Sequence, residues 1–413
     1  MSSQHLPLSL LLRILPRTAE LAGLRQAMLA RSTADPHDEW SGSRAYATLD
    51  RRVLTDDALE SIFAEAEARS IEHVRTYHRL LRDALREAAA ADGDGALARL
   101  RDLGEAAAGE GRWETCISYY GAVAAIAAEL QDVQLLNLAQ RRMGRAHLHL
   151  GHPQRAARWY AQSLQTAHEI DDTEAVITAH TGLGHTLALE GRWEEAEREY
   201  LKSHAACGLT FPRMRAQAAI NLSMTAREQQ RLDDARRWLD DARTQWDSFE
   251  PFERSVWNNN SGLLALALGR HVDAQRAFEA ALADSPSHHD TAMILDNLAE
   301  LCLRTGDVDR AEAHARSAED YAIAGASARA LADIYIRLGR IMRARRDIHG
   351  IAFLEKAIQI SQENGYTLTE ANACTEYALF RTMLGDTDEA RGLRERAELL
   401  LARVSEREAL RDW

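Results

Sequence analysis

The chain has 413 residues, with 63 aspartates and glutamates against 50 lysines and arginines, and a formal net charge of −13. This acidity argues against direct binding to nucleic acid or to an anionic membrane, because both partners carry the same sign of charge. Few prolines and phenylalanines, seven of each, beside abundant alanine, leucine, arginine and glutamate are typical of an all-helical protein.

The N-terminal residues divide into two predicted segments that precede any repeated pattern. Residues 1–32 contain an amphipathic helix, which Pro16 interrupts. Residues 33–96 are a turn-rich linker followed by a helical hairpin that begins near Asp56 and ends at Gly95. We expect these segments to cap a helical array. The alternatives are an effector module and, for the leading helix, pairing with a second copy as a homodimer.

From residue 97 to residue 403 one pattern recurs about eight times, with a period close to 40 residues. Its clearest copy combines Gly191, Trp193, Ala196 and Tyr200, and blurred copies lie near residues 232–235 and 347–357. A small residue follows each turn at Cys116, Ala156, Ala196, Ala235, Ala274, Ala311, about position 350, and Ala390. A fixed period of this length is typical of a solenoid.

Each copy reads as a helical hairpin. In the clearest copy, residues 178–189 have helical periodicity, Gly191 ends that helix, and residues 194–205 form a second amphipathic helix. A glycine inside a helix costs about 1 kcal/mol relative to alanine. The same interior position is glycine in four copies, namely Gly104, Gly144, Gly184 and Gly262. We therefore predict a close approach of the two helices there, and stacking of the hairpins.

The pattern resembles the tetratricopeptide repeat. The matching positions are Leu183, Gly184, Leu187, Gly191, Trp193, Ala196 and Tyr200, with Pro286 at the place of the proline that ends a repeat. Common copies have 34 residues. The longer copies here are similar to those of kinesin light chains, bacterial peptide-pheromone receptors and the sensor domains of some transcriptional activators. The resemblance implies a right-handed superhelical solenoid, with residues 404–413 as a helical tail.

In such a solenoid the first helix of each repeat lines a concave binding face. Three asparagines, Asn221, Asn260 and Asn297, occupy the equivalent position in consecutive copies. An amide offers both donors and an acceptor, so it suits a peptide backbone. A ladder resembling this one holds the peptide in kinesin light chains and in the O-linked N-acetylglucosamine transferase superhelix. The alternative is that these asparagines bond to one another, or to the next helix, as a structural seam.

Arginines flank the asparagines on the expected concave face. Because arginine binds carboxylates through two parallel hydrogen bonds, they favour an acidic ligand or a C-terminal carboxylate. The alternative is a solvated face balanced by Glu105, Asp296 and Glu300. The full set of predicted peptide-binding residues is Arg141, Arg142, Arg145, His185, Asn221, Arg227, Asn259, Asn260, Asn297, Arg337 and Arg340.

Neither a membrane segment nor a catalytic site is expected. No window of about 18 residues is continuously apolar. The cysteines, Cys116, Cys207, Cys302 and Cys374, lack the spacing of a metal site or a disulfide framework, and we expect them to be core residues in the cytoplasm. No motif brings a nucleophile, a base and an orienting group together, so we expect no enzyme and no cofactor.

Two functions remain open. The first is a non-catalytic scaffold or adaptor that holds an extended peptide or a partner segment in the concave groove, where the arginines favour an acidic one. The alternative is a peptide-responsive regulatory receptor in bacterial signalling or transcription control, with the N-terminal helices as its effector module.

Four aromatic residues lie close together in the sequence, namely Trp246, Phe249, Phe252 and Trp257. We expect their side chains to pack in the core between two repeats.

Overall fold

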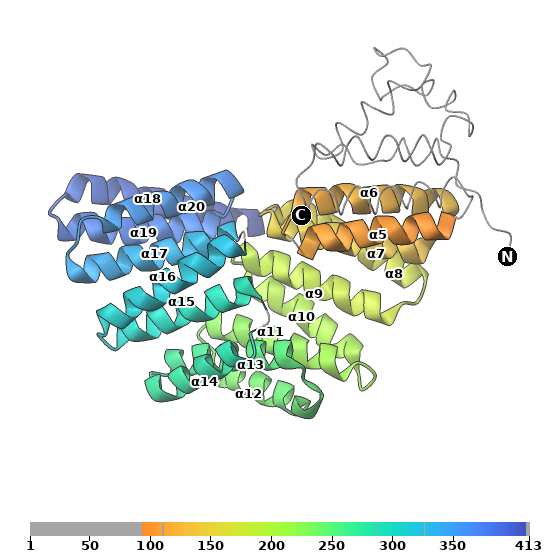
Figure 1. Ribbon diagram of the computed structural model, residues 1–413, viewed down its shortest axis with the longest axis horizontal. Coiled ribbons are helices and arrows are strands. Elements are labelled where there is room, and N and C mark those ends of the chain that lie inside the picture. Colours follow the sequence, from red (N-terminus) through yellow and green to blue (C-terminus); the bar gives the residue numbers. More distant parts are fainter. Residues whose placement is uncertain (1–92, 110, 286, 326, 410–413) are drawn as a thin grey trace, which may run out of the picture. The chain divides into compact units, whose positions relative to one another are not determined.

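The computed structural model describes residues 93–109, 111–285, 287–325 and 327–409. All regular secondary structure in these ranges is helical, and they contain no strand (Figure 1). The prediction of an all-α fold is therefore confirmed. Residues 1–92, Glu110, Pro286, Ala326 and residues 410–413 lie outside the described residues, and so does the predicted cap except for its last four residues. The prediction that Gly95 ends the hairpin is wrong, because α5 already begins at Gly93. The predicted limits of the array, residues 97 and 403, fall inside the first and last described helices.

Helices with odd numbers are called A helices here, and those with even numbers B helices. The first eight are α5 (Gly93–Gly109), α6 (Trp113–Leu130), α7 (Val133–His149), α8 (Pro153–Glu169), α9 (Thr173–Leu189), α10 (Trp193–Cys207), α11 (Pro212–Glu228) and α12 (Leu232–Arg243). After the short 3-10 helix η2 (Trp246–Ser248) come α13 (Pro251–Ala267), α14 (His271–Ala283), α15 (His288–Arg304), α16 (Val308–Ala324), α17 (Ala328–Arg345), α18 (Gly350–Asn364), α19 (Thr367–Met383) and α20 (Thr387–Ala409).

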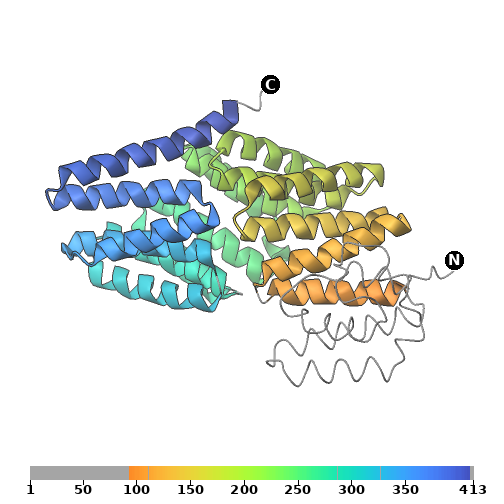
Figure 2. The ribbon, with the colours of Figure 1, turned by 90° about the horizontal axis from the view of Figure 1, so that it is seen from above.

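The chain forms two compact units. Among the described residues, unit 1 contains 93–150 and 158–175, and unit 2 contains 151–157 and 176–409. Within unit 2, each helix from α10 to α20 contacts the next, and the pairs α15–α16, α17–α18 and α19–α20 lie side by side in both views (Figure 1, Figure 2). Short turns join the helices, so neighbouring helices run in opposite directions.

The turn between helix A and helix B follows the glycine pattern. Gly191 has φ of 76°, a left-handed conformation that glycine adopts without steric cost, as predicted. The two blurred copies keep this conformation without glycine: Gln230 has φ of 61° and Arg346 has φ of 59°. The repeat is hard to recognise in these two copies because the turn keeps its backbone conformation although the glycine is replaced.

The predicted close approach of helices A and B is confirmed. A Cβ atom built on Gly184 would lie 2.4 Å from the ring of Tyr200, which is fully buried on the B helix. The other predicted glycines meet rings in the same way, in the pairs Gly104–Tyr120, Gly144–Tyr160 and Gly262–Phe278. A fifth pair, Gly339 against Leu354, was not predicted and belongs to the repeat whose copy is blurred near residues 347–357. Each pair joins the two helices of one repeat.

The aromatic group between α12 and α13 is core in three of its four members. The ring of Trp246 lies 5.6 Å from that of Phe249 and 5.3 Å from that of Trp257. Trp257 also donates a hydrogen bond from Nε1 to the carbonyl oxygen of Leu239, at 2.9 Å. The expectation is wrong for Phe252, which is 46% exposed in the first turn of α13.

All four cysteines are buried, and burial raises the pKa of the Cys116 and Cys207 thiols to about 11, from an ordinary value of 9.0. The reactive thiolate of these two is therefore about 100-fold scarcer near pH 8 than in an exposed cysteine. We expect Cys116 and Cys207 to react with a thiol reagent at least about 100-fold more slowly in the folded protein than in denaturant. Stopped-flow absorbance measures both rates, and a fast phase in the folded protein would contradict the buried placement.

Within the described ranges, no helix combines the length and the apolar character needed to cross a membrane.

Candidate functional site

The three asparagines of the predicted ladder occupy the same place in three consecutive A helices of unit 2. Asn221, Asn260 and Asn297 are each the tenth residue of a 17-residue helix, respectively α11, α13 and α15. The repeat fixes this position, because each asparagine lies two residues before a small buried residue, namely Ser223, Gly262 or Ala299. The common position does not give the three amides a common environment.

Two of the amides are engaged inside the protein. Asn297 donates from Nδ2 to Oδ1 of Asn259, at 2.9 Å, and so joins α15 to α13. Asn260 donates from Nδ2 to the carbonyl oxygen of Val256 in its own helix, also at 2.9 Å. For Asn297 and Asn259 the contact is the structural seam that the sequence left as an alternative.

Asn221 differs from the other two. Its side chain is buried, with 6% of its surface exposed. Its Oδ1 accepts one long hydrogen bond, of 3.5 Å, from Nε2 of Gln217. Its Nδ2 is buried and has no hydrogen-bond partner among the described residues. A buried donor left unpaired in this way costs about 1–3 kcal/mol of stability. A hydrogen-bond acceptor that reached Nδ2 of Asn221 would remove this cost.

The arginines of α17 contact carboxylates on the neighbouring A helices. Arg337 donates from Nε and Nη2 to the two carboxylate oxygens of Asp296, both at 3.1 Å, and also pairs with Glu300. Arg340 donates from Nη1 to Glu300 at 2.8 Å, and its Nε lies 3.4 Å from Glu376. Glu300 is buried, with its side chain 9% exposed. These arginines therefore already hold carboxylates of the protein.

The three predicted arginines of α7 belong to unit 1. Arg142 places Nε 2.9 Å from a carboxylate oxygen of Glu105 on α5. Arg141 is half-buried, and burial lowers its pKa, against the opposite influence of Asp172. Arg145 is exposed. These three residues thus belong to unit 1, whereas the asparagines belong to unit 2.

The two remaining predicted residues lie on α9 and α11. The imidazole of His185 packs edge-on against the ring of Tyr200, with centroids 5.5 Å apart and the planes at 66°. Arg227 has a side chain that is 18% exposed and donates from Nη2 to Glu228 at 2.8 Å. Burial lowers the pKa of Arg227. Both lie in unit 2, with the asparagines.

Sequence reasoning missed the partners Gln217 and Glu376. A signal for the charged contacts was present, because opposite charges on equivalent faces of A helices lie close to one repeat length apart. Arg337 follows Asp296 by 41 residues and Glu300 by 37, so each pair lies within a helical turn of the repeat period. Asp296 and Glu300 were expected from the sequence as balancing carboxylates, and the same kind of separation, 36 residues from Arg340, points to the missed Glu376.

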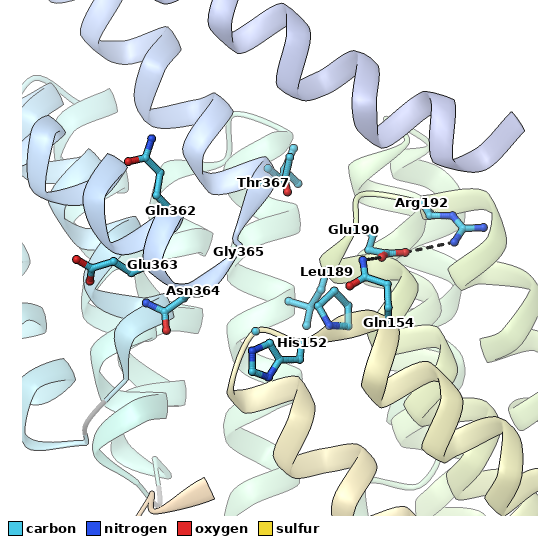
Figure 3. A pocket seen from close by; sticks show the side chains of 13 residues that line it. His152, Gln154, Leu189, Glu190, Arg192, Gln362, Glu363, Asn364, Gly365 and Thr367 are labelled. Atoms are coloured by element: carbon cyan, nitrogen blue, oxygen red, sulfur yellow. Dashed lines mark hydrogen bonds and ion pairs between the residues drawn. The ribbon is translucent and has the colours of Figure 1, made fainter. Parts of the chain in front are cut away.

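Figure 3 shows a separate pocket of unit 2, with a volume of about 400 Å³. Gln154, Glu190 and Arg192 lie on one side of it, and Gln362 and Asn364 lie on the other (Figure 3). Glu190 accepts hydrogen bonds from Gln154 at 2.7 Å and from Arg192 at 3.2 Å. None of the predicted binding residues lines this pocket. Elsewhere in the described ranges, no three His, Cys, Asp or Glu side chains are grouped to hold a metal ion.

Family models of the tetratricopeptide repeat match residues 253–324, 177–200 and 216–241. No curated protein matches the chain by sequence. Several solved structures have the same fold. The apo form of RapI matches with a TM-score of 0.53 and 12% identity, over 66% of this chain and 98% of RapI.

Two further structures match over more of the chain. The Rap conjugation gene regulator of plasmid pLS20, in complex with the Phr* peptide, has a TM-score of 0.54 and 12% identity, over 85% of this chain and 91% of its own. The apo quorum sensor NprR from B. thuringiensis has a TM-score of 0.50 and 13% identity, over 83% of this chain and 93% of its own. At these identities the comparison establishes a shared helical solenoid fold.

Proposed function

Since this chain is a tetratricopeptide-repeat protein, we propose that it is a non-catalytic cytoplasmic protein that binds an extended peptide or protein segment against the A helices of unit 2. The observation that carries the proposal is the buried, unpaired Nδ2 of Asn221. A backbone carbonyl of the ligand supplies the acceptor that this donor lacks. The fold shared with a Rap protein solved with a peptide supports the proposal.

The surroundings of Asn221 suit a peptide chain. Met224, one turn further along α11, is half-buried and offers an apolar contact to a side chain of the ligand. Asn260 occupies the equivalent position on the next A helix, and His185 lies on the preceding one. In this proposal Asn259, Asn297, Arg337 and Arg340 hold the A helices together, while Asn221 and Asn260 face the ligand.

The first test replaces Asn221 with alanine. We expect Asn221→Ala to weaken peptide binding about 5- to 13-fold, since one buried hydrogen bond contributes roughly 1–1.5 kcal/mol. Immobilised full-length protein is mixed with acetylated, amidated hexapeptides of random neutral sequence, and mass spectrometry measures what is retained. Asn372→Ala, on an exposed part of α19, is the matched control and is expected to retain the same peptides as the wild type.

Stability separates this proposal from a structural role. Because Asn221→Ala removes an unpaired buried donor, the free protein is expected to keep its free energy of unfolding or gain up to about 1 kcal/mol. Loss of stability together with unchanged peptide retention would show that Asn221 is part of the seam, and would refute the proposed site.

A regulatory receptor is the alternative function. Two of the chains with this fold are a conjugation gene regulator and a quorum sensor, and each match covers more than four fifths of this chain. In this alternative, peptide binding changes the arrangement of the repeats and so acts on the N-terminal residues. A small-angle scattering profile that does not change when a retained peptide is added would argue against it.

A further inference from the structure

The pocket of about 400 Å³ lies where two stretches of unit 2 that are far apart in the sequence meet (Figure 3). The turn between α7 and α8 approaches the turn between α18 and α19 so closely that a Cβ atom on Gly151 would overlap the backbone oxygen of Asn364. That Cβ atom would also lie 2.5 Å from the ring of Tyr366, which is buried. Gly151 has φ of 71°, so both its conformation and its surroundings require glycine. The two walls of the pocket are therefore joined at this contact.

One wall of the pocket carries a carboxylate that is only partly neutralised. Glu190, whose side chain is 11% exposed, accepts hydrogen bonds from Nε2 of Gln154 at 2.7 Å and from Nη1 of Arg192 at 3.2 Å. Arg192 is buried, and its Nε also donates to Glu195 at 2.5 Å. One guanidinium group thus serves two carboxylates, so this wall keeps a net negative charge.

The opposite wall is the end of α18, and its charge has the same sign. The carbonyl groups at a helix C-terminus carry a partial negative charge, which basic side chains usually offset. The last turn of α18 has no basic residue. It contains Glu363 instead, an exposed carboxylate whose partner among the described residues is the neutral amide of Gln359, at 2.8 Å. A cation at this end of α18 would therefore be stabilising.

Two helices also begin at the pocket, but their first residues offer it no free N–H group. The first residue of α8 is Pro153, which has no N–H. The first residue of α19 is Thr367, whose N–H donates to the carbonyl oxygen of Gly365 at 3.0 Å. An anion would therefore lack donors at these two positions, and the acceptors of the two walls decide the chemistry of the ligand.

We propose that this pocket binds a small organic cation, whose ammonium or guanidinium group lies between Glu190 and the end of α18. Such groups have only donors, and the pocket offers acceptors, among them Oε1 of Gln154, since that amide uses Nε2 on Glu190. Leu189 and Leu368 are half-buried and also line the pocket, so they offer apolar surface to a short carbon chain. The volume lies within the range of about 300–1,000 Å³ that is usual for small-molecule sites.

The test uses four compounds with a four-carbon chain that differ in charge. Putrescine carries two ammonium groups, agmatine has a guanidinium group in place of one of them, 1,4-butanediol is neutral, and succinate is a dianion. Isothermal titration calorimetry with the full-length protein, at a salt concentration of about 0.15 M, measures their affinities. We expect putrescine or agmatine to bind at least about tenfold more tightly than the other two. The tighter of the cations identifies the preferred group, and its binding should raise the thermal midpoint.

Three variants locate the site. Glu190→Gln keeps the size of the side chain but removes its charge, and it is expected to weaken binding of the cation about tenfold or more. Glu363→Lys supplies an ammonium group at the end of α18 and should weaken binding about threefold or more. Because a cation stabilises a helix C-terminus, Glu363→Lys should keep or raise the thermal midpoint of the free protein, which shows that the loss does not come from unfolding. Glu398→Gln, which removes the same charge from an exposed part of α20, is expected to bind as the wild type does.

The results decide the inference in either direction. Selective binding of a cation that Glu190→Gln and Glu363→Lys weaken, and Glu398→Gln does not, supports it. If Glu190→Gln binds putrescine and agmatine as tightly as the wild type, the acidic surface as a whole attracts them and the pocket is not the site. Equal binding of all four compounds, or binding of none, would also refute the inference. These measurements are independent of peptide binding at Asn221, which is tested separately.

Discussion

Gly184→Ala is expected to lower the free energy of unfolding by about 3 kcal/mol, because a methyl group here overpacks the contact between α9 and α10. The new Cβ would lie 2.4 Å from the ring of Tyr200, and that ring is fully buried. The effect is opposite to the usual one, since alanine in an exposed helix is about 1 kcal/mol more stable than glycine. Chemical denaturation followed by circular dichroism measures the change.

Gly392→Ala is the matched control for this substitution. Gly392 is exposed inside α20, and a Cβ atom built there meets nothing within 4 Å. We expect this variant to gain about 1 kcal/mol. Equal changes at the two positions would contradict the packing argument. In addition, Tyr200→Leu should reduce the cost of Gly184→Ala, and a double-mutant cycle should give a coupling energy of about 1 kcal/mol or more.

Glu300→Ala is expected to lower the free energy of unfolding by about 3–4 kcal/mol, because it leaves partly buried guanidinium groups without their counter-charge. Glu300 pairs with Arg304 at 2.7 Å, with Arg340 at 2.8 Å, and with Arg337. Its side chain is 9% exposed and that of Arg337 is 14% exposed, so water screens the contacts only weakly. Denaturation curves of the wild type and the variant provide the comparison.

The control for Glu300 is an exposed ion pair. Asp388 pairs with Arg391 on α20, with side chains that are 86% and 66% exposed, and Asp388→Ala should change stability by less than about 0.5 kcal/mol. A similarly small change for Glu300→Ala would mean that Arg337 and Arg340 do not depend on it. Asp296 and Glu376 would then suffice as their counter-charges.

The repeat architecture could be predicted because its determinants are local. The packing glycine and its aromatic partner are 16 residues apart in the same copy, as Gly184 and Tyr200 are, and the turn glycine lies between them. Helical periodicity and a turn residue are readable within such a span. The copies that contain Gln230 and Arg346 were harder to recognise, because the turn keeps its left-handed backbone conformation without the glycine that marks it elsewhere.

The candidate site could be predicted only as a set of positions. The sequence placed Asn221, Asn260 and Asn297 in register, but it could not give their hydrogen-bond partners, which depend on side-chain rotamers and on residues of other helices. Asn297 thus bonds across to Asn259, while Asn221 does not have an equivalent contact. The arginines show the same limit, because Arg337 is paired within the protein and Arg227 is not fully paired.

The contacts between neighbouring A helices also restrict the order of the repeats. Each packing glycine meets a residue of its own repeat, so a whole repeat could be moved or duplicated without disturbing that contact. The polar contacts between repeats are different. The seam from α13 to α15 is an amide pair, whereas those from α15 to α17 and from α17 to α19 are ionic. Exchanging neighbouring repeats would place arginines opposite amides. The polar contacts between repeats therefore determine the order of the repeats along the chain, whereas the glycine contacts determine the shape of each repeat.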